Sequence, residues 1–250
     1  MSRVMLITGG SRGIGAATAR LAAARGYDVA FSYASNSAAA DAVAADISRA
    51  GRRAVAVQAD MGRPEDITRL FAALDADFGR LDAFFNNAGI FGRASRFVDI
   101  GPDRLQHMLA VNTAGPFLAA QAAVRRMSTR LGGKGGTIVN MSSMAAKLGG
   151  SNEATDYAAS KGAIDTLTIG LAKELAGEGI RVNAVRPGLI YTDIHASVGN
   201  PDRVDKLKHL VPLQRGGTAE EVAEAVLWLC SEQSSYCTGL IVDVAGGRGI

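Results

Sequence analysis

The sequence has little cysteine, histidine and proline: two, three and six residues among 250. Cys230 and Cys237 lie in or beside an apolar stretch without C-x-x-C spacing, which predicts buried free thiols and excludes a disulfide framework or a metal pair. This cysteine usage suits a reducing cytoplasm. His107, His195 and His209 are scattered without metal-ligand spacing, so no metal site is expected.

A long apolar run is also missing near the N-terminus. The run Val4–Ile7 is too short for a secretory signal or a membrane span, which predicts a cytoplasmic protein that does not enter a membrane. The net charge is only +3, and Lys and Arg form no block interleaved with aromatic residues. Nucleic-acid binding is therefore not expected, and Arg52–Arg53 and Arg125–Arg126 are interpreted as solvated faces.

Glycine, by contrast, is abundant at 30 residues, and 48% of the chain is hydrophobic. Small residues allow helices to pack closely on a sheet and allow tight turns between strands and helices. Apolar strands and alanine-rich helices alternate along the chain without a linker, repeat or low-complexity segment. We therefore expect one α/β domain over residues 1–250, a doubly wound parallel sheet of about seven strands with helices on both faces.

Hydrophobic periodicity and the positions of glycine and proline define the expected elements. Strands are predicted at residues 4–7, 29–31, 54–58, 81–85, 137–141, 181–185 and 240–244. Helices are predicted at residues 16–25, 38–49, 64–78, 102–127, 156–176 and 219–231. Pro116 should bend the long fourth helix. The stretch between Pro187 and Gly217 is irregular, and a mobile substrate loop is expected at about residues 188–213.

The first predicted strand leads into a glycine-rich loop, Thr8–Gly15, and then a helix. In a parallel sheet, ligands bind at the carboxyl ends of the strands, where glycines let backbone N–H groups and a helix N-terminus approach a pyrophosphate. Gly9, Gly13 and Gly15 have the spacing G-x-x-x-G-x-G, which differs from the G-x-G-x-x-G dinucleotide fingerprint. A nucleotide site is the favoured interpretation, and a purely structural turn is the alternative.

Tyr157 and Lys161 lie four residues apart on a predicted helix and therefore share one face. A cation favours the phenolate form of a tyrosine, whose ordinary pKa is about 10. The pair is thus suited to exchange a proton with a substrate. Taken alone, the same spacing also describes a packed ring beside a snorkelling lysine.

Together these motifs resemble those of the short-chain dehydrogenase/reductase family over nearly the whole chain. The family's T-G-x-x-x-G-x-G is residues 8–15 here, its N-N-A-G is residues 86–89, and its Y-x-x-x-K is residues 157–161. Asn112 matches the family's helix asparagine, and Pro187–Gly188 matches its P-G after strand six. The likeness is to bacterial sugar-dehydrogenase-like and 3-oxoacyl-reductase-like members. It implies a Rossmann-type fold and a nicotinamide-dependent oxidoreductase that acts on carbonyl or secondary alcohol groups.

The resemblance also implies roles for individual residues. Tyr157 would be the acid/base at the substrate oxygen, and Ser143 would hold that oxygen by a hydrogen bond. Lys161 would stabilise the tyrosinate and bind the ribose hydroxyls, and Asn112 would anchor a water that leads protons to solvent. The implied cofactor-binding residues are Gly9, Ser11, Arg12, Gly13, Ile14, Gly15, Asp60, Met61, Asn86, Asn87, Ala88, Gly89, Tyr157, Lys161, Pro187, Gly188, Ile190 and Thr192.

Ser142 precedes Ser143, so two serines are candidates for the catalytic position. The gap to Tyr157 is one residue longer than in many relatives of the family. The family's usual serine is the second of the pair, which favours Ser143 and leaves Ser142 as a packing or loop-bonding hydroxyl. An insertion within residues 147–155 would leave the geometry unaffected, because that segment is typical of a loop.

The end of the second predicted strand bears on the cofactor. NAD-specific sites place an acidic residue there for the ribose 2′-OH, whereas residues 31–36 read Phe-Ser-Tyr-Ala-Ser-Asn and contain no carboxylate. Arg12, next to Gly13, could pair with a 2′-phosphate, as its counterpart does in NADP-using relatives. NADP(H) is therefore the expected cofactor, and NAD(H) is the alternative.

The substrate is a small carbonyl or alcohol compound that the sequence does not identify. Its pocket should be lined by residues after Gly89, by residues 144–155 and by residues from Leu189 onward, with no assignable counter-ion. A cluster on one helix end could dock an acidic acyl carrier protein, which makes a 3-oxoacyl thioester the alternative substrate. The cluster consists of Arg125, Arg126 and Arg130.

By resemblance, a homotetramer is expected, in which the helix from Pro102 and the helix with Tyr157 pair with their copies and the C-terminal segment makes a second contact. Small and apolar residues on these helices permit close approach. They are Ala122, Ala123, Ala163, Ile164 and Leu167. A redox sensor or scaffold is the alternative function, but such proteins usually lose the tyrosine or lysine, and both are present.

Overall fold

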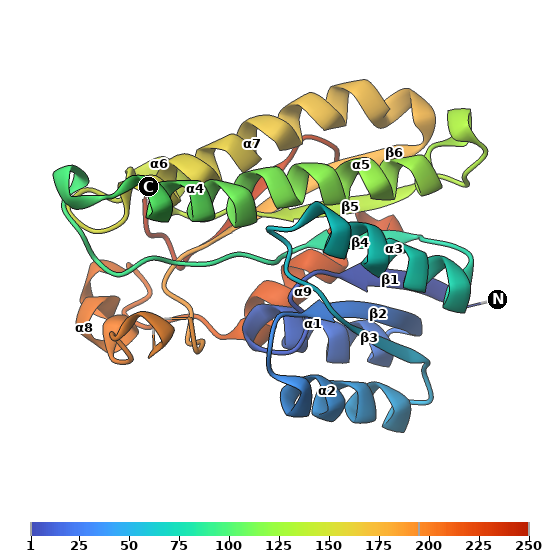
Figure 1. The fold of residues 1–250 in the computed structure, drawn as a ribbon, viewed down its shortest axis with the longest axis horizontal. Coiled ribbons are helices and arrows are strands. Elements are labelled where there is room, and N and C mark those ends of the chain that lie inside the picture. Colours follow the sequence, from blue (N-terminus) through green and yellow to red (C-terminus); the bar gives the residue numbers. More distant parts are fainter. Residues whose placement is uncertain (1, 195, 250) are drawn as a thin grey trace.

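The computed structural model describes residues 2–194 and 196–249, so the predicted non-ligand His195 lies outside the described residues. One sheet of seven parallel strands forms the centre of the molecule, in the order β3-β2-β1-β4-β5-β6-β7 (Figure 1). The strands are β1 (Arg3–Ile7), β2 (Tyr27–Tyr33), β3 (Ala54–Gln58), β4 (Ala83–Asn86), β5 (Gly136–Met141), β6 (Ile180–Pro187) and β7 (Ile241–Val244). The chain winds outward from β1 and later from β4, so the predicted doubly wound fold is confirmed. A crevice at the switch between β1 and β4 is where such sheets bind ligands.

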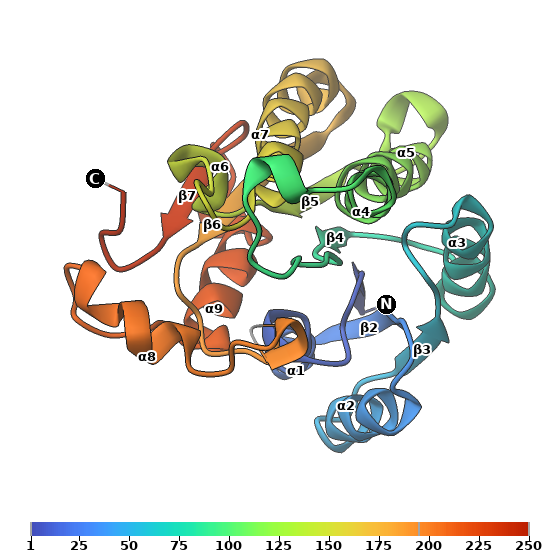
Figure 2. The same cartoon turned by 60° about the vertical axis from the view of Figure 1, so that its left-hand side comes forward.

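Helices cover both faces of the sheet (Figures 1 and 2). On one face lie α1 (Gly13–Ala24), α2 (Ser37–Arg49) and α9 (Ala219–Leu229). On the other face lie α3 (Pro64–Phe78), α5 (Gly115–Met127) and α7 (Thr155–Leu175). The shorter helices are α4 (Pro102–Leu109), α6 (Ala145–Leu148) and α8 (Arg203–Leu207).

Successive residues of the central strands alternate between two apolar cores. Met5 and Ile7 of β1 pack in the core with α1, α2 and α9, whereas Val4 and Leu6 pack in the core with α3, α5 and α7. Neighbouring side chains of a strand point to opposite faces, so unbroken apolar strands have both faces covered, as parallel sheets require. Burying one such large side chain stabilises the fold by about 1.5–3 kcal/mol.

The predicted single helix at residues 102–127 is interrupted. The π-helical turn η2 (Ala110–Ala114) separates α4 from α5, and Pro116 stands in the first turn of α5, where its missing N–H is tolerated. The change in helix geometry near Pro116 is thus a π-helical turn just before it. A Cβ on Gly115 would collide with the Met61 carbonyl oxygen, so glycine allows the helix to pass close to the chain after β3.

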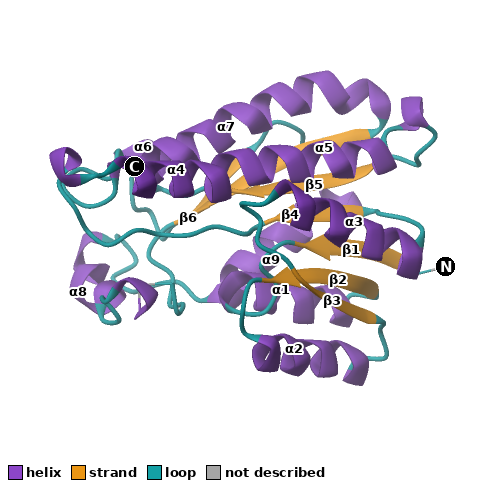
Figure 3. Cartoon of the chain, viewed as in Figure 1, coloured by secondary structure: helices purple, strands orange, loops and turns teal. Residues whose placement is uncertain are grey.

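The predicted irregular stretch between β6 and α9 contains local structure. Figure 3 shows α8 within long loops, and the 3-10 turns η5 (Ala196–Val198) and η6 (Lys208–Leu210) flank it. A bridge joins Ile190 to Gly217, which closes the segment at its base. A small apolar cluster of Leu189, Val204 and Val211 fills it.

Strand β2 begins earlier than predicted, because Asp28 is satisfied inside the fold. Its carboxylate accepts the Arg53 backbone N–H at 3.0 Å and the Ser2 hydroxyl. Hydrogen bonds of this kind compensate the cost of burying the charge. The pKa of Asp28 is lowered by these hydrogen bonds and by the two arginines Arg52 and Arg53, although burial opposes the shift.

Two predictions about polar side chains need correction. Cys230 is buried, and burial raises the pKa of its thiol to about 11, but Cys237 is partly exposed; both are free thiols. Arg126 is not on a solvated face, because its guanidinium lies 4.8 Å from the centre of the Phe71 ring and pairs with Asp75. The local charge pattern does not predict such packing, because Phe71 and Asp75 are distant from Arg126 in the sequence.

Within residues 2–194 and 196–249, no helix combines the length and hydrophobicity needed to cross a membrane. In the same residues, His, Cys, Asp and Glu side chains form no group of three that could hold a metal ion. His107 and His209 are exposed.

Candidate active site

The glycine loop after β1 has a conformation that only glycine adopts readily. Gly9 and Gly13 have φ angles of +67° and +53°, in the left-handed region that penalises a Cβ. A Cβ on Gly15 would approach the Gly9 carbonyl oxygen well inside 3.0 Å, closer than real Cβ atoms come. The Gly9 N–H donates to the buried Ser32 hydroxyl at 3.0 Å. The loop is thus pressed against β2 and its own helix.

The predicted N-N-A-G stretch is tied to this loop by hydrogen bonds. The Thr8 hydroxyl accepts the backbone N–H groups of Asn87 and Ala88 at 2.9 and 3.0 Å. The Asn87 side chain donates to the Thr8 and Gly9 carbonyl oxygens at 2.8 and 3.0 Å. Asn86 differs, because its side chain donates inward to the Pro116 carbonyl and to Asn140. The buried Asn86 side chain therefore joins β4 to β5 and to the start of α5.

The N-terminus of α1 fits a phosphate group. No side chain caps its first turn, and that turn contains no acidic residue. Helix N-termini leave N–H groups without an intrahelical partner and carry partial positive charge, and both features favour an anion. Ser11 and Ile14 lie at this turn, between and beside the glycines. The predicted nucleotide loop therefore has the shape and the free donors that a pyrophosphate needs.

The expected adenine-ribose end lies at the carboxyl ends of β2 and β3. Arg12 is exposed at the start of α1. The side-chain oxygen of Asn36 caps α2 by accepting the Ala39 N–H at 3.0 Å, and this bond does not use the amide N–H groups. Asp60 accepts the Gly62 N–H at 2.9 Å, which shapes the turn that holds the buried Met61.

The expected nicotinamide end lies after β6. A Cβ on Gly188 would meet the Ala245 Cα at 2.9 Å, so the turn after Pro187 needs glycine there. Ile190 is buried, and the Thr192 methyl group lies 3.4 Å from the position of a Cβ on Gly13. The structure thus brings Thr192 to the glycine loop although it is far from Gly13 in sequence, which suits a dinucleotide whose pyrophosphate lies at the loop and whose nicotinamide lies near the end of β6.

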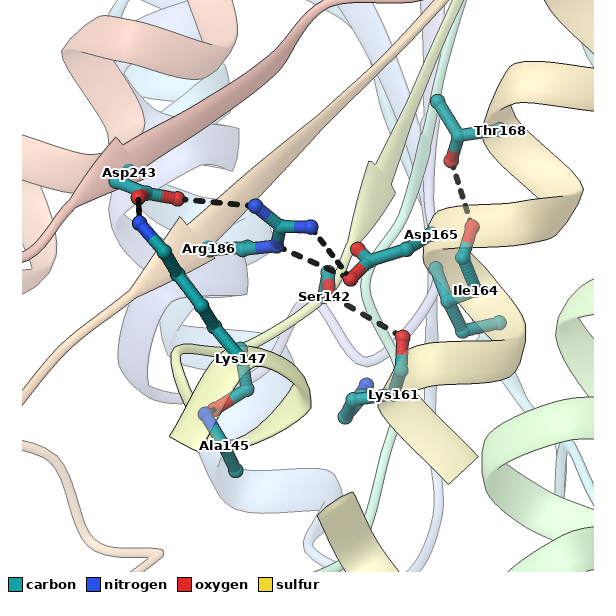
Figure 4. Close-up of polar contacts among 10 residues, drawn as sticks. Ser142, Ala145, Lys147, Lys161, Ile164, Asp165, Thr168, Arg186 and Asp243 are labelled. Atoms are coloured by element: carbon teal, nitrogen blue, oxygen red, sulfur yellow. Dashed lines mark hydrogen bonds and ion pairs between the residues drawn. The ribbon is translucent and has the colours of Figure 1, made fainter. Parts of the chain in front are cut away.

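Ser143 and Ser142 have different surroundings. The Ser143 hydroxyl lies beside the Tyr157 side chain and acts to lower its pKa, and it accepts the Ala145 N–H at 3.1 Å. Ser142 is buried and donates to the Lys161 backbone carbonyl at 3.3 Å, as Figure 4 shows. Since successive residues point to opposite sides of an extended chain, only one of the pair faces the tyrosine hydroxyl.

The pKa of Tyr157 is raised, which the Tyr–Lys spacing alone did not predict. Burial has the largest effect and disfavours the phenolate; the hydrogen bond from Ser143 and the charge of Arg203 act in the opposite direction but are weaker. The ring packs edge-on against Phe91, with centroids 4.8 Å apart. The Lys161 ammonium lies 5.7 Å from the centroid of the Tyr157 ring.

Lys161 is almost completely buried, with 2% of its surface exposed. Its Nζ donates to the Met141 carbonyl at 2.8 Å, and a Cβ on Gly89 would lie 3.4 Å from that nitrogen. Burial lowers the pKa of Lys161 to about 8, and the negative charge of Asp165 opposes this shift. The amine is therefore close to half-protonated in mildly alkaline solution.

Asn112 lies in the π-helical turn η2 and is fully buried. Its side chain exchanges two hydrogen bonds with the Ile90 backbone, at 2.8 and 2.9 Å, and a third contact reaches the Ser160 hydroxyl at 3.3 Å. The wider turn of the helix aims this amide at the strand β4 connection, beside Gly89. All four predicted catalytic residues are thus brought together around the end of β5.

Several residues around Tyr157 were not singled out from the sequence. Arg203 is almost buried, lies 5.5 Å from the centre of the Phe91 ring and forms a two-hydrogen-bond ion pair with Glu153 at 2.6–2.7 Å. Asp156 forms a similar pair with Arg104 at 2.7 and 3.0 Å. Arg203, Glu153 and Phe91 fall in the three segments expected to line the pocket, whereas Asp156 lies just beyond residues 144–155. No local signal pairs residues 50 or 52 positions apart, because the pairing depends on the tertiary fold.

Comparison with known proteins agrees with this geometry. The sequence profile described as "Enoyl-(Acyl carrier protein) reductase" matches residues 9–248. The uncharacterized oxidoreductase YgfF of Escherichia coli (strain K12) is 50% identical over 245 residues, which cover 98% of this chain and 99% of that protein.

Two solved structures match with a TM-score of 0.91, each over 99% of this chain and 98% of the other. One is a short chain dehydrogenase from Burkholderia cenocepacia J2315 in complex with NADP, 37% identical. The other is 3-ketoacyl-(acyl-carrier-protein) reductase from Brucella melitensis complexed with NADH, 31% identical. The fold and the site therefore define a Rossmann-type oxidoreductase. The chain belongs to the short-chain dehydrogenase/reductase family, and the resemblance of its motifs is confirmed.

Proposed function

We propose that this protein transfers hydride between a nicotinamide cofactor and a carbonyl or secondary alcohol, with Tyr157 as the acid/base. The observation that supports this most strongly is the buried Lys161 amine, which lies one helical turn from Tyr157 and beside Gly89, in the stretch that is hydrogen-bonded to the glycine loop. A proton donor, a second hydroxyl and a buried amine thus share one edge of the sheet, where ligands of such folds bind.

The residues would divide the work as follows. The bound nicotinamide supplies or accepts the hydride. Ser143 would hold the substrate oxygen, and Tyr157 would donate or accept its proton. The raised pKa of Tyr157 keeps the phenol protonated, which suits donation during carbonyl reduction. Lys161 would bind the ribose hydroxyls, and Asn112 would anchor a water that leads protons toward solvent.

NADP(H) is the proposed cofactor. The end of β2 contains no carboxylate between Phe31 and Asn36, and Arg12 is exposed beside the glycine loop, where it can meet a 2′-phosphate. The matched Burkholderia protein was solved with NADP and the Brucella protein with NADH, so both cofactors belong in the test. Residues 1–250 would form a single NAD(P)-binding domain, with the substrate loop at about residues 188–213.

A 3-oxoacyl carrier-protein thioester is the second candidate substrate, because the matched Brucella protein carries that reductase name. On the proposed docking cluster, Arg125 and Arg130 are exposed, whereas Arg126 is held by Asp75. Arg130 also lies 4.0 Å from the Glu178 carboxylate, so the cluster supports a carrier protein less strongly than three free cations would. The substrate panel therefore includes a 3-oxoacyl thioester.

The direct test is NADPH and NADH absorbance with a panel of ketones, alcohols and the thioester. Tyr157→Phe should lower turnover by about 10²- to 10⁴-fold, the usual contribution of a general acid/base, while NADPH binding stays within about twofold because the ring still packs. Tyr236→Phe is the matched control, since this fully exposed ring should lose a hydroxyl without effect. Turnover by Tyr157→Phe within a few-fold of the parent would refute the assignment.

We also propose a cytoplasmic homotetramer assembled through α5 and α7. Ala123 and Ile164, two of the residues expected at this interface, are buried within one subunit, which corrects that part of the prediction. Phe117 and Ile169 on the same helices are instead exposed large apolar side chains. Light scattering at micromolar concentration distinguishes a tetramer from a monomer.

A further inference from the structure

The buried amine of Lys161 needs a compensating charge. An ammonium without one is costly to bury, and it would release its proton instead. Its hydrogen bond to the Met141 carbonyl supplies a dipole at 2.8 Å but no charge. Around it lie the Tyr157 phenol on α7, the neutral Asn112 amide of η2 and the Gly89 backbone. Among the described residues, charged side chains of α6, β7 and β6 form a series of ion pairs that ends at one carboxylate, Asp165.

Asp165 lies one helical turn after Lys161, so both side chains occupy the same face of α7. One carboxylate oxygen, Oδ2, accepts two hydrogen bonds from Arg186 of β6, at 3.0 and 2.8 Å. The other oxygen, Oδ1, is buried and has no hydrogen-bond partner in the described part of the chain. A buried acceptor without a partner is unusual, and this carboxylate lies one helical turn from Lys161 without a hydrogen bond to its amine.

The carboxylate is the end of a line of alternating charges, which Figure 4 shows. Lys147 of α6 pairs with Asp243 of β7 at 3.3 Å, Asp243 pairs with Arg186 at 3.4 Å, and Arg186 pairs with Asp165. The line has no net charge, but its negative end is nearest to Lys161. Because Coulomb energy falls with distance, the nearest charge acts most strongly. Asp165 is accordingly the one charge that acts on Lys161 among the described residues.

We propose that Asp165 is a positioning residue that keeps Lys161 in its ammonium form, and that Arg186 fixes the carboxylate in the orientation this requires. The inference rests on the proposed function, since it concerns the amine assigned to ribose binding and to the proton path. It predicts that Lys161 loses its proton at lower pH when the Asp165 charge is removed. Removal of a charge elsewhere on the same line has a smaller effect.

The test measures the protonation of Lys161 directly, without turnover. Protein with ¹³C-labelled lysine is titrated by NMR between pH 6 and 11, and the Lys161 signal is assigned by its absence in Lys161→Met. In Asp165→Asn, the midpoint should fall by about one pH unit, the effect of losing one close opposite charge. Asp243→Asn is the matched control, because it removes the same charge from the same arginine farther along the line; its midpoint should move by less than half as much.

Activity gives a second, independent readout. With any accepted substrate, the alkaline limb of the kcat/KM profile should move to lower pH in Asp165→Asn. The loss of activity relative to the parent should therefore be smaller at pH 6 than at higher pH. An equal loss at every pH with an unmoved NMR midpoint would overturn the proposal and assign Asp165 a structural role. Equal midpoint shifts in Asp165→Asn and Asp243→Asn would also overturn it.

Asp165→Asn leaves Arg186 without its main partner and could destabilise the fold. The double variant Asp165→Asn/Arg186→Gln removes both charges and still lacks the carboxylate, so its midpoint should also lie below that of the parent. A midpoint equal to the parent's would overturn the proposal. If the parent reduces none of the carbonyl compounds, the proposed function fails, but the NMR titration still decides the role of Asp165.

Discussion

The two ends of the cleft are built in different ways. The glycine loop is fixed by close approach of backbone to backbone, by N–H groups donated to the hydroxyls of Thr8 and Ser32, and by the Asn87 side chain, which donates to the loop carbonyls. The substrate segment is fixed by side chains: one bridge at Ile190, a small apolar cluster and the ion pair between Arg203 and Glu153. A backbone-made site tolerates almost no substitution, whereas a side-chain-made site can change its specificity without changing the fold. The same sheet edge therefore carries a backbone-made half and a side-chain-made half.

Gly15→Ala should have the largest effect, because the new Cβ would collide with the Gly9 carbonyl oxygen, which is backbone and has little room to move. Overpacking of this kind costs about 1–3 kcal/mol. We expect a lower melting temperature and a marked loss of NADPH affinity, measured by thermal unfolding and by fluorescence titration. The damage should be confined to the cofactor end if the rest of the site folds independently of it.

Gly162→Ala is the control for this variant. Gly162 lies in α7 with no atom within 4 Å of the position of a Cβ, and alanine is favoured over glycine inside a helix by about 1 kcal/mol. Its stability should stay equal or rise. Unchanged NADPH binding by Gly15→Ala would contradict the backbone-made description of the cofactor end.

The sequence predicted the backbone-made half of the cleft well, because its signals are local. Turns that need glycine, apolar strands and helix starts each depend on neighbouring residues, so the order of elements and the nucleotide loop followed from them. The π-helical turn at Ala110–Ala114 did not follow, since the periodicity of α4 and α5 runs through it and no local pattern marks the wider turn.

The side-chain-made half of the cleft was predicted less completely. The segments around the pocket were predicted, but the pairing of Arg203 with Glu153 and the contact of Arg203 with Phe91 depend on residues that only the fold brings together. The sign of the Tyr157 pKa shift was missed for a related reason. The Tyr–Lys spacing shows a nearby cation but not the extent of burial, and burial has the larger effect.

Arg203→Gln should act on the substrate end alone. The change removes a charge that lowers the Tyr157 pKa, so that pKa should rise further, and it leaves Glu153 without its arginine. We expect kcat/KM to fall by about tenfold, equivalent to about 1.4 kcal/mol, mainly through KM, because the substrate loop loses its tie to residues 150–155. NADPH affinity should stay within about twofold.

Arg96→Gln provides the comparison, since this arginine is exposed on the loop before α4. It should leave both constants unchanged. If Arg203→Gln weakened NADPH as strongly as substrate, the two ends of the cleft would be one coupled unit, and the contrast between them would be wrong.

Arg12→Ala should have the smallest effect, and it tests whether an exposed side chain beside the glycine loop contributes to cofactor selection. Arg12 is exposed, so its hydrogen bonds to a 2′-phosphate are weakened by water and salt, and we expect about a tenfold loss of kcat/KM for NADPH at low ionic strength. NADH lacks the phosphate, and its kcat/KM should hardly change, whereas a distorted glycine loop would weaken both cofactors equally. Arg49→Ala, which removes an exposed arginine at the far end of α2, controls for the general loss of positive charge. A parent enzyme that prefers NADH, or an Arg12→Ala variant with equal losses for both cofactors, would show that the missing acid after β2 does not select the phosphate.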